Sequence, residues 1–365
     1  MRYARTMTDA LPAVPGVLTG ADIRATGESI AAAQEDSGAI GWPDGLVDAW
    51  NHVECAMALS VCGLRGPARR AYDWLLATQR ADGSWPRRTA PGGEVSEAAG
   101  ESNHAAYVAV GTWHEYLVTG DAGFAGRMWP AVRGAIGFAL GLQTARGEII
   151  WQRDAAGEPA SYALLTGCAS MYQSLRCAAA LADLAGEPQP DWELAAARLA
   201  HAVACHPEAF ADKSQFSMDW YYPVLGGPVR GPAAARWLAA GWPDFVVPGL
   251  GVRCIRDQDW VTGAETCELV LALDATGDRE RALGMFAEIQ HLRDDGGAYW
   301  TGWQFANSRH FPNERSGYTG AAVVLAADAL SRTTGGSGLF RTMGADTAPA
   351  PAPDPVRCGC PAPPA

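Results

Sequence analysis

The chain has 365 residues, of which 48% are hydrophobic and 19% are charged, so it is long enough to bury a large core. Its formal net charge of −12 argues against binding to nucleic acid, because an acidic surface repels phosphate backbones. The sequence has no apolar run of about 18 residues and no apolar segment near its start. We therefore expect a cytoplasmic protein with no membrane span and no secretory signal.

Apolar residues recur at intervals of three and four along most of the chain, which is typical of amphipathic helices. Alanine, leucine and arginine dominate these stretches, and clusters of glycine and proline separate them. No apolar–polar alternation extends over the length of a strand, so the predicted fold class is all-α. In chain order, the predicted helical stretches are Leu46–Leu64, Ala68–Gln79, Ala105–Thr119, Ala131–Gln143, Leu164–Leu184, Trp192–Cys205, Glu265–Leu273, Glu280–Leu292 and Gly320–Leu330.

The two ends of the chain differ in composition from its middle. Glycine, proline and alanine dominate the C-terminal end, which has too few apolar side chains to offset the entropy of ordering. We predict a flexible N-terminus over residues 1–17, a single domain over 18–334 and a disordered tail over 335–365. Seven of the nine cysteines lie in apolar stretches and are interpreted as packing residues, whereas Cys358 and Cys360 fall in the tail.

One unit occurs four times: an apolar helix ends in glutamine, and a glycine-containing turn then leads to tryptophan. Gln34, Gln79, Gln143 and Gln290 are the four glutamines. A glutamine at the end of a helix can hydrogen-bond exposed carbonyl groups or the backbone of the following turn. Because one helical hairpin cannot bury its apolar face alone, the repeat predicts hairpins that stack on one another.

The best copy of this unit, RRAYDWLLATQRADGSW from Arg69 to Trp85, resembles the Gln-Trp repeat of the squalene–hopene cyclase and prenyltransferase superfamily. The resemblance extends over roughly residues 29–330, closely in this copy and loosely in the other three. It implies an (α/α)6 toroid of stacked helical hairpins, with inner helices around a central cavity. It also implies an isoprenoid substrate.

The chain departs from the metal-binding and acid motifs of that superfamily. The Asp-x-Asp-Asp motif of class II cyclases is only half present, at Asp257-Gln258-Asp259. Gly317-Tyr318-Thr319 occupies the place of a histidine-containing motif in zinc-dependent prenyltransferases. Because HExxH, CxxC and Asp-Asp-x-x-Asp are also absent, we predict no metal site and no cofactor.

Carboxylates and aromatic residues gather where apolar helices begin, and inner-helix N-termini of a toroid point toward one rim. Glu265, which resembles the acid at the start of the cyclase helix, is the first candidate for a catalytic acid. The other catalytic candidates are Asp219, Glu54 and Glu314. The substrate-binding candidates are Trp50, His52, Asn103, His104, Trp220, Tyr221, Asp259, Trp260, Trp300 and Trp303.

These residues fit more than one function. The main prediction is an enzyme related to terpene cyclases and prenyltransferases, in which a carboxylic acid protonates a small isoprenoid and aromatic faces stabilise the carbocation. The alternative is a glycan-processing hydrolase on the same toroid, with two carboxylates flanking a sugar bond. A third possibility is a non-catalytic binding protein or scaffold.

Overall fold

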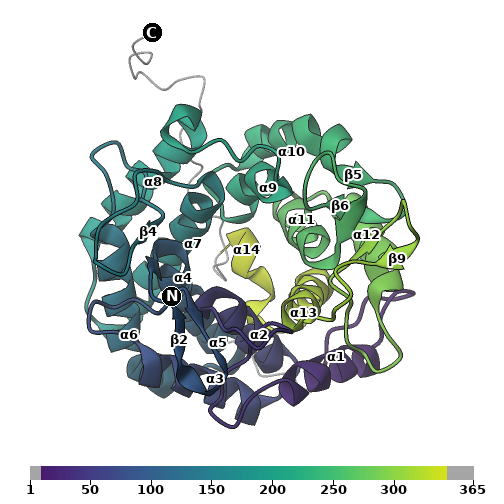
Figure 1. Ribbon diagram of the computed structural model, residues 1–365, viewed down its shortest axis with the longest axis horizontal. Coiled ribbons are helices and arrows are strands. Elements are labelled where there is room, and N and C mark those ends of the chain that lie inside the picture. The colour runs from purple at the N-terminus through teal and green to yellow at the C-terminus, as the bar shows by residue number, and fades with distance from the viewer. Residues whose placement is uncertain (1–9, 343–365) are drawn as a thin grey trace.

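The computed structural model describes residues 10–342 and is predominantly helical, with two concentric rings of helices (Figure 1). In the inner ring each helix packs on the next, and the last packs on the first. The inner helices are α2 (Ala49–Val61), α5 (Val108–Thr119), α7 (Leu165–Ala185), α9 (Ser217–Leu225), α11 (Gly263–Thr276) and α13 (Gly317–Ser331). The short helix α4 (Ser102–Ala106) leads directly into α5. The predicted arrangement of stacked helical hairpins is confirmed.

The outer ring alternates with the inner ring along the chain, and each inner helix from α2 to α11 forms a hairpin with the outer helix that follows it. The outer helices are α1 (Gly20–Ala32), α3 (Arg65–Thr78), α6 (Ala122–Leu140), α8 (Pro190–Cys205), α10 (Gly231–Phe245) and α12 (Arg279–Glu288). The pattern of buried residues explains why some helices lie in the inner ring and others in the outer ring. Outer helix α3 buries only one face, through residues such as Tyr72 and Leu75, whereas inner helix α13 is buried continuously from Thr319 to Leu330.

The all-α prediction needs correction, because short strands connect the hairpins. They form two antiparallel pairs, β1 with β2 and β3 with β4, and a separate antiparallel sheet of order β5-β6-β7-β8-β9. None of these strands exceeds three residues, so none is long enough to show apolar–polar alternation in the sequence. The strands are β1 (Arg88–Thr89), β2 (Val95–Glu97), β3 (Gly100–Glu101), β4 (Gln152–Arg153), β5 (Val246–Val247), β6 (Gly251–Arg253), β7 (Trp260–Thr262), β8 (Gly302–Gln304) and β9 (Arg309–His310).

One helix of the inner ring is missing from the predicted helical stretches. The aromatic segment that begins at Ser217 forms the inner helix α9, with Pro223 inside it. Its many aromatic residues conceal the helical period, because almost every position is buried. Single-turn 3-10 helices complete the fold: η1 (Pro91–Gly93), η2 (Pro207–Ala209), η3 (Ile289–Leu292) and η4 (Gly335–Gly338).

The glutamines of the repeated unit join neighbouring outer helices. Gln79 Nε2 donates to Gly83 O in its own turn at 2.9 Å and to Ala131 O of the next outer helix, α6, at 2.8 Å. Gln34 makes the same pair of bonds to its turn and to α3, and Gln143 does so to its turn and to α8. The predicted hydrogen-bonding role of these glutamines is confirmed, and it explains why the unit repeats.

The glycines of these turns lie against the same neighbouring helices. Gly83 has a φ of +89° and faces the backbone of Gly134 in α6 so closely that a Cβ would overlap the Gly134 carbonyl. The equivalent glycine of the last unit, Gly297, lies against Ala25 in α1, and Thr26 Oγ1 donates to Gly297 O at 2.8 Å. This last contact joins the end of the chain of hairpins to its beginning and closes the ring.

All inner helices begin at one face of the ring, which we call the rim. The backbone just before each inner helix pairs with the connection that precedes the next one. Examples are Val47 with Thr89, Ala163 with Phe210 and Phe216 with Ile255. The sheet β5–β9 belongs to the same face, because β7 runs directly into α11.

The C-terminal segment of the described residues packs at the opposite face. Helix α14 (Leu339–Thr342) lies within the ring in projection (Figure 1). Arg341 pairs with Asp274 near the end of α11, and Gly335 lies against the carbonyl of Leu117 near the end of α5. Ordered helix therefore continues to Thr342, beyond the expected boundary at residue 334. The rest of the predicted tail, including Cys358 and Cys360, and residues 1–9 lie outside the described residues.

The seven cysteines within residues 10–342 are free thiols. Five of them are buried, in agreement with their interpretation as packing residues. No helix in this part of the chain combines the length and apolar character needed to cross a bilayer.

Substituting Gly83 with alanine tests the contact between a turn and the next helix. We expect Gly92→Ala, where φ is +81° and no neighbour lies within 4 Å, to cost about 1–2 kcal/mol of backbone strain. Gly83→Ala has the same strain and also the overlap with Gly134, so it should cost about 1–3 kcal/mol more. Urea unfolding measures both, and equal losses for the two variants would contradict the importance of this contact.

Candidate active site

Two buried carboxylates, Glu54 of α2 and Glu268 of α11, form the centre of the candidate site. Both lie in the second turn of their helices, on the rim side of the inner ring, and they are only 4% and 2% exposed. Helix α13 packs against both α2 and α11, and its Tyr318 donates to Glu268 Oε1 at 2.8 Å. The site therefore joins three inner helices.

The hydrogen bonds of Glu54 leave one of its oxygens free. Its Oε1 accepts from Tyr107 Oη at 2.9 Å and from Trp50 Nε1 at 3.2 Å. Within residues 10–342, no donor is bonded to Oε2. A protonated Glu54 can therefore present its proton on Oε2 while Oε1 fixes the orientation of the carboxyl group.

Glu268, by contrast, is surrounded by tyrosine hydroxyls. Tyr222 donates to Oε1 at 2.7 Å, beside the bond from Tyr318, and Tyr221 donates to Oε2. Three hydroxyl donors stabilise a negative charge. Because α9 supplies two of these tyrosines and α13 the third, Glu268 also holds the inner helices together at this point.

The two carboxyl groups affect each other's ionisation. Burial raises the pKa of Glu54 to about 7, against the stabilising bonds from Tyr107 and Trp50. Burial raises the pKa of Glu268 as well, to about 8, and repulsion by the charge of Glu54 adds to this shift. One proton is therefore retained by the pair near neutral pH. Both oxygens of Glu268 already accept from tyrosine hydroxyls, so Oε2 of Glu54 is the oxygen from which the pair can give this proton to a ligand.

Asp48, which caps the N-terminus of α2, is an ionised neighbour of this pair. Burial acts to raise the pKa of Asp48, but attraction to His104 and hydrogen bonds from Asn51 and Trp42 outweigh it and lower the pKa. Trp42 Nε1 donates to Asp48 Oδ2 at 2.7 Å. Electrostatic repulsion from Asp48 in turn helps to keep Glu54 protonated.

Two other predicted acids lie in the first turns of inner helices. Glu265 of α11 is half-buried, accepts a hydrogen bond from the Cys254 thiol and raises the pKa of nearby Glu268. Asp219 of α9 is held by Thr166, whose backbone N–H and hydroxyl both donate to its Oδ1, and burial raises its pKa. Glu265 therefore belongs to the central cluster, whereas Asp219 is bound to the start of α7.

The structure places several of the predicted binding residues around Glu54. Trp50 is half-buried, and its ring contacts His104, Tyr107 and Tyr222 with centroid separations of 5.8–6.0 Å. The predicted residue Tyr221 bonds to Glu268. Asn103, beside His104 in α4, is 2% exposed, and its Oδ1 has no hydrogen-bond partner in the described structure.

His52 and Trp220 point away from this cluster, so the structure does not support their predicted roles. His52 is fully buried, with its Nδ1 accepting from Ile40 N and its Nε2 2.8 Å from Ala71 O of α3. Burial lowers its pKa to about 4, so it is neutral. Trp220 stacks on Phe245 and donates to carbonyl groups of α10. Both side chains join an inner helix to an outer one.

The remaining predicted residues lie in or beside the sheet β5–β9. Trp300 stacks on His310 at 4.2 Å, Trp303 also contacts His310, and Trp260 packs edge-on against Phe311. Asp259 is an exposed turn residue, and Glu314 accepts only a long bond of 3.4 Å from Thr301 Oγ1. These residues are at the margin of the rim, and no contact joins them to Glu54 or Glu268 in the described structure.

Sequence reasoning missed the central carboxylate Glu268 and the tyrosines Tyr107, Tyr222 and Tyr318. One signal was available: Glu268 follows the predicted Glu265 by three positions, so the two share a face of α11. Among residues 10–342, no three His, Cys, Asp or Glu side chains are grouped as metal ligands would be.

Comparison with known proteins identifies the family. No protein-family model matches the sequence. The MMP endo-(1,4)-3-O-methyl-α-D-mannosidase of Mycolicibacterium hassiacum is 58% identical over 334 residues, which cover 91% of this chain and 92% of that protein. This chain belongs to the same glycoside hydrolase family.

Solved structures with a similar fold have much lower sequence identity. A wild-type glycosidase superimposes with a TM-score of 0.64 at 17% identity, covering 85% of this chain and 96% of its own. A D-mannose isomerase gives 0.64 at 13% identity, covering 86% and 96%. A rhamnosidase from Klebsiella oxytoca with rhamnose bound gives 0.60 at 17%, covering 90% and 66%. These likenesses concern the fold alone.

The predicted relationship to terpene cyclases and prenyltransferases is therefore wrong, and so is the isoprenoid substrate. The 58% identity to a mannosidase supports the alternative, an enzyme that hydrolyses glycans. The Gln-Trp unit misled the prediction because its contacts are structural. Gln79 and Gly83 join one outer helix to the next, which any ring of hairpins requires whatever its chemistry.

The raised pKa of Glu54 predicts a pH-dependent cost to stability. Between the ordinary value of 4.5 and about 7, the folded state keeps a proton that the unfolded chain releases, so stability falls as pH rises through this range. Glu54→Gln cannot ionise and should raise the Tm at about pH 8 but leave it nearly unchanged at about pH 4. Differential scanning calorimetry measures this, with exposed Glu158→Gln as control. An equal shift at both pH values would contradict the assignment.

Proposed function

We propose that the chain is an endo-acting glycoside hydrolase that cleaves α-(1→4) bonds between 3-O-methyl-D-mannose residues. The observation that carries the proposal is the 58% identity, over nearly the whole of both chains, to an enzyme of that description. The scaffold is the double ring of six hairpins, taken as an (α/α)6 toroid, with its carboxylates at the rim.

Glu54 is the general acid in this proposal. Glycosidic cleavage needs a carboxylic acid that still holds its proton near neutral pH and can give it to the leaving oxygen. Burial gives Glu54 a pKa of about 7, and Tyr107 and Trp50 fix its Oε1, while no described residue hydrogen-bonds its Oε2.

Glu265 is the second carboxylate. It lies in the first turn of α11, where the helix dipole favours a negative charge, and it is half-buried rather than enclosed. As the ionised partner it would activate water or attack the anomeric carbon as the bond to the leaving oxygen breaks. Glu268 then acts as a positioning residue, because its oxygens are already occupied by three tyrosines.

Trp50 provides a surface for the sugar. Aromatic rings bind the C–H faces of sugars, and an O-methyl group adds apolar surface that a ring can cover. Trp50 is half-buried, is fixed by three aromatic neighbours and donates to Glu54, so a sugar against its ring would lie beside the acid.

Replacing the two carboxylates tests the chemistry. We expect Glu54→Gln and Glu265→Gln each to lower kcat by at least about 100-fold on 3-O-methylmannose oligosaccharides, measured by the release of reducing ends. Glu314→Gln, at the margin of the rim, is the matched control and should change kcat only a few-fold. Activity retained in both acid variants would refute these roles, and a wild-type enzyme that leaves these oligosaccharides intact would refute the proposed function.

The pH dependence of kcat/KM provides a separate test of the acid. Because Glu54 must be protonated, activity should fall as pH rises through its pKa of about 7. Tyr107→Phe removes one donor that stabilises the ionised form, so it should move this alkaline limb to higher pH. If kcat/KM of this variant falls at the same pH as that of the wild type, another group supplies the proton.

A further inference from the structure

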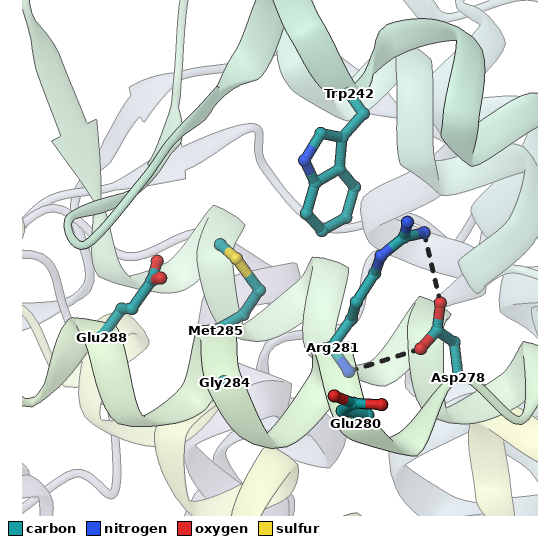
Figure 2. A pocket seen from close by; sticks show the side chains of 7 residues that line it. All are labelled: Trp242, Asp278, Glu280, Arg281, Gly284, Met285 and Glu288. Carbon is teal, nitrogen blue, oxygen red and sulfur yellow. Dashed lines mark hydrogen bonds and ion pairs between the residues drawn. The ribbon is translucent and has the colours of Figure 1, made fainter.

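The outer wall of the ring contains a pocket that the proposed chemistry does not use. It lies between α10 and α12 and has a volume of about 640 Å³, within the usual range for small-molecule sites (Figure 2). We call it the outer pocket. The residues used in the argument are Trp242, Asp278, Glu280, Arg281, Met285 and Glu288.

One side of the outer pocket is aromatic and apolar. Figure 2 shows the Trp242 ring across from Met285, with the Arg281 side chain between Trp242 and Asp278. The ring is fixed by an edge-on contact with Trp220, and the Arg281 guanidinium lies 4.9 Å from its centroid. A half-buried, fixed indole above a methionine suits the C–H face or methyl group of a sugar.

The polar side of the pocket is rich in hydrogen-bond acceptors. Glu288 is half-buried, and its Oε2 has no hydrogen-bond partner among residues 10–342. A rotation of this side chain into the pocket would let Oε2 accept from a ligand hydroxyl. Arg281 is already paired with Asp278 at 3.3 Å. With Asp278, Glu280 and Glu288 against one arginine, the pocket repels anions and favours a neutral, hydroxyl-rich ligand.

The outer pocket extends along the whole length of α12, from the capping residue Asp278 to the last residue, Glu288, and its Glu288 end is nearest the rim. Trp242 lies in the last turn of α10. Each of these ends leads to a connection that enters an inner helix at the rim. A polymer lying across the rim can therefore continue onto the outer wall between α10 and α12.

We propose that the outer pocket is a second binding site for the methylated mannose chain, separate from the carboxylate cluster. This inference rests on the proposed function. Trp242 and Met285 contact the methyl and C–H groups of one sugar, and Glu288 accepts a hydroxyl. Binding a long chain at two places raises its apparent affinity without any new contact at the reacting bond.

A non-hydrolysable probe separates this inference from the catalytic one. Isothermal titration calorimetry with a sulfur-linked 3-O-methylmannose oligosaccharide counts the sites on the wild-type chain. We expect Trp242→Ala and Glu288→Ala each to lose one site. Leu194→Ala, an exposed residue elsewhere on the outer wall, is the control and should lose none. Unchanged stoichiometry in both pocket variants would overturn the proposal. If Trp242→Ala does not fold, the result for Glu288→Ala alone decides.

Kinetics give a second readout. In both pocket variants KM should rise at least about threefold on long chains, while kcat and the KM for oligosaccharides too short to reach the outer wall stay unchanged. An equal rise on short and long substrates would place Trp242 and Glu288 in the catalytic site instead and overturn the proposal. If the wild-type chain cleaves nothing yet the pocket variants still lose a binding site, the proposed function fails and the outer pocket stands.

Discussion

The fold depends on one repeated contact, the bond from a glutamine at the end of an outer helix to the backbone of the next outer helix. Gln34, Gln79 and Gln143 each use a single amide nitrogen for two carbonyls, one in their own turn and one in the neighbour. These two hydrogen bonds fix both the conformation of the turn and the distance between neighbouring hairpins. In the last unit a threonine of the neighbouring helix makes the contact instead: Thr26 of α1 donates to Gly297 O, where the last hairpin meets the first.

Once the hairpins are spaced in this way, the chemistry at the rim follows from burial. Inner helices are enclosed on all sides, so a carboxylate in their second turn has little water around it. Glu268 is accommodated there by three tyrosines, whereas Glu54 has only two donors on one oxygen. The difference in donors separates Glu268, whose oxygens are both occupied and which fixes the helices, from Glu54, which has one oxygen open to react.

Much of the architecture was predictable from the sequence, but the family was not. Helical period and the glutamine–glycine turns revealed the hairpins, because those features are local. The same turns wrongly suggested an isoprenoid enzyme. Gln79 and Gly83 determine how helices stack, and they carry no information about the substrate. Of the site, Glu54, Trp50, Tyr221 and Glu265 were predicted from their place at helix starts. Glu268 and Tyr318 were missed, because their importance comes from side chains on three different helices meeting.

The C-terminal segment gives the ring two unequal faces. Arg230 donates to the carbonyl of Phe340, and Arg341 pairs with Asp274, so α14 is tied to the ends of inner helices away from the rim. In the proposed function a glycan would approach the carboxylates from the rim and lie across it with both ends outside the ring. Any bond along a long chain could then take the reacting position, which is what cleavage in the middle of a polymer requires.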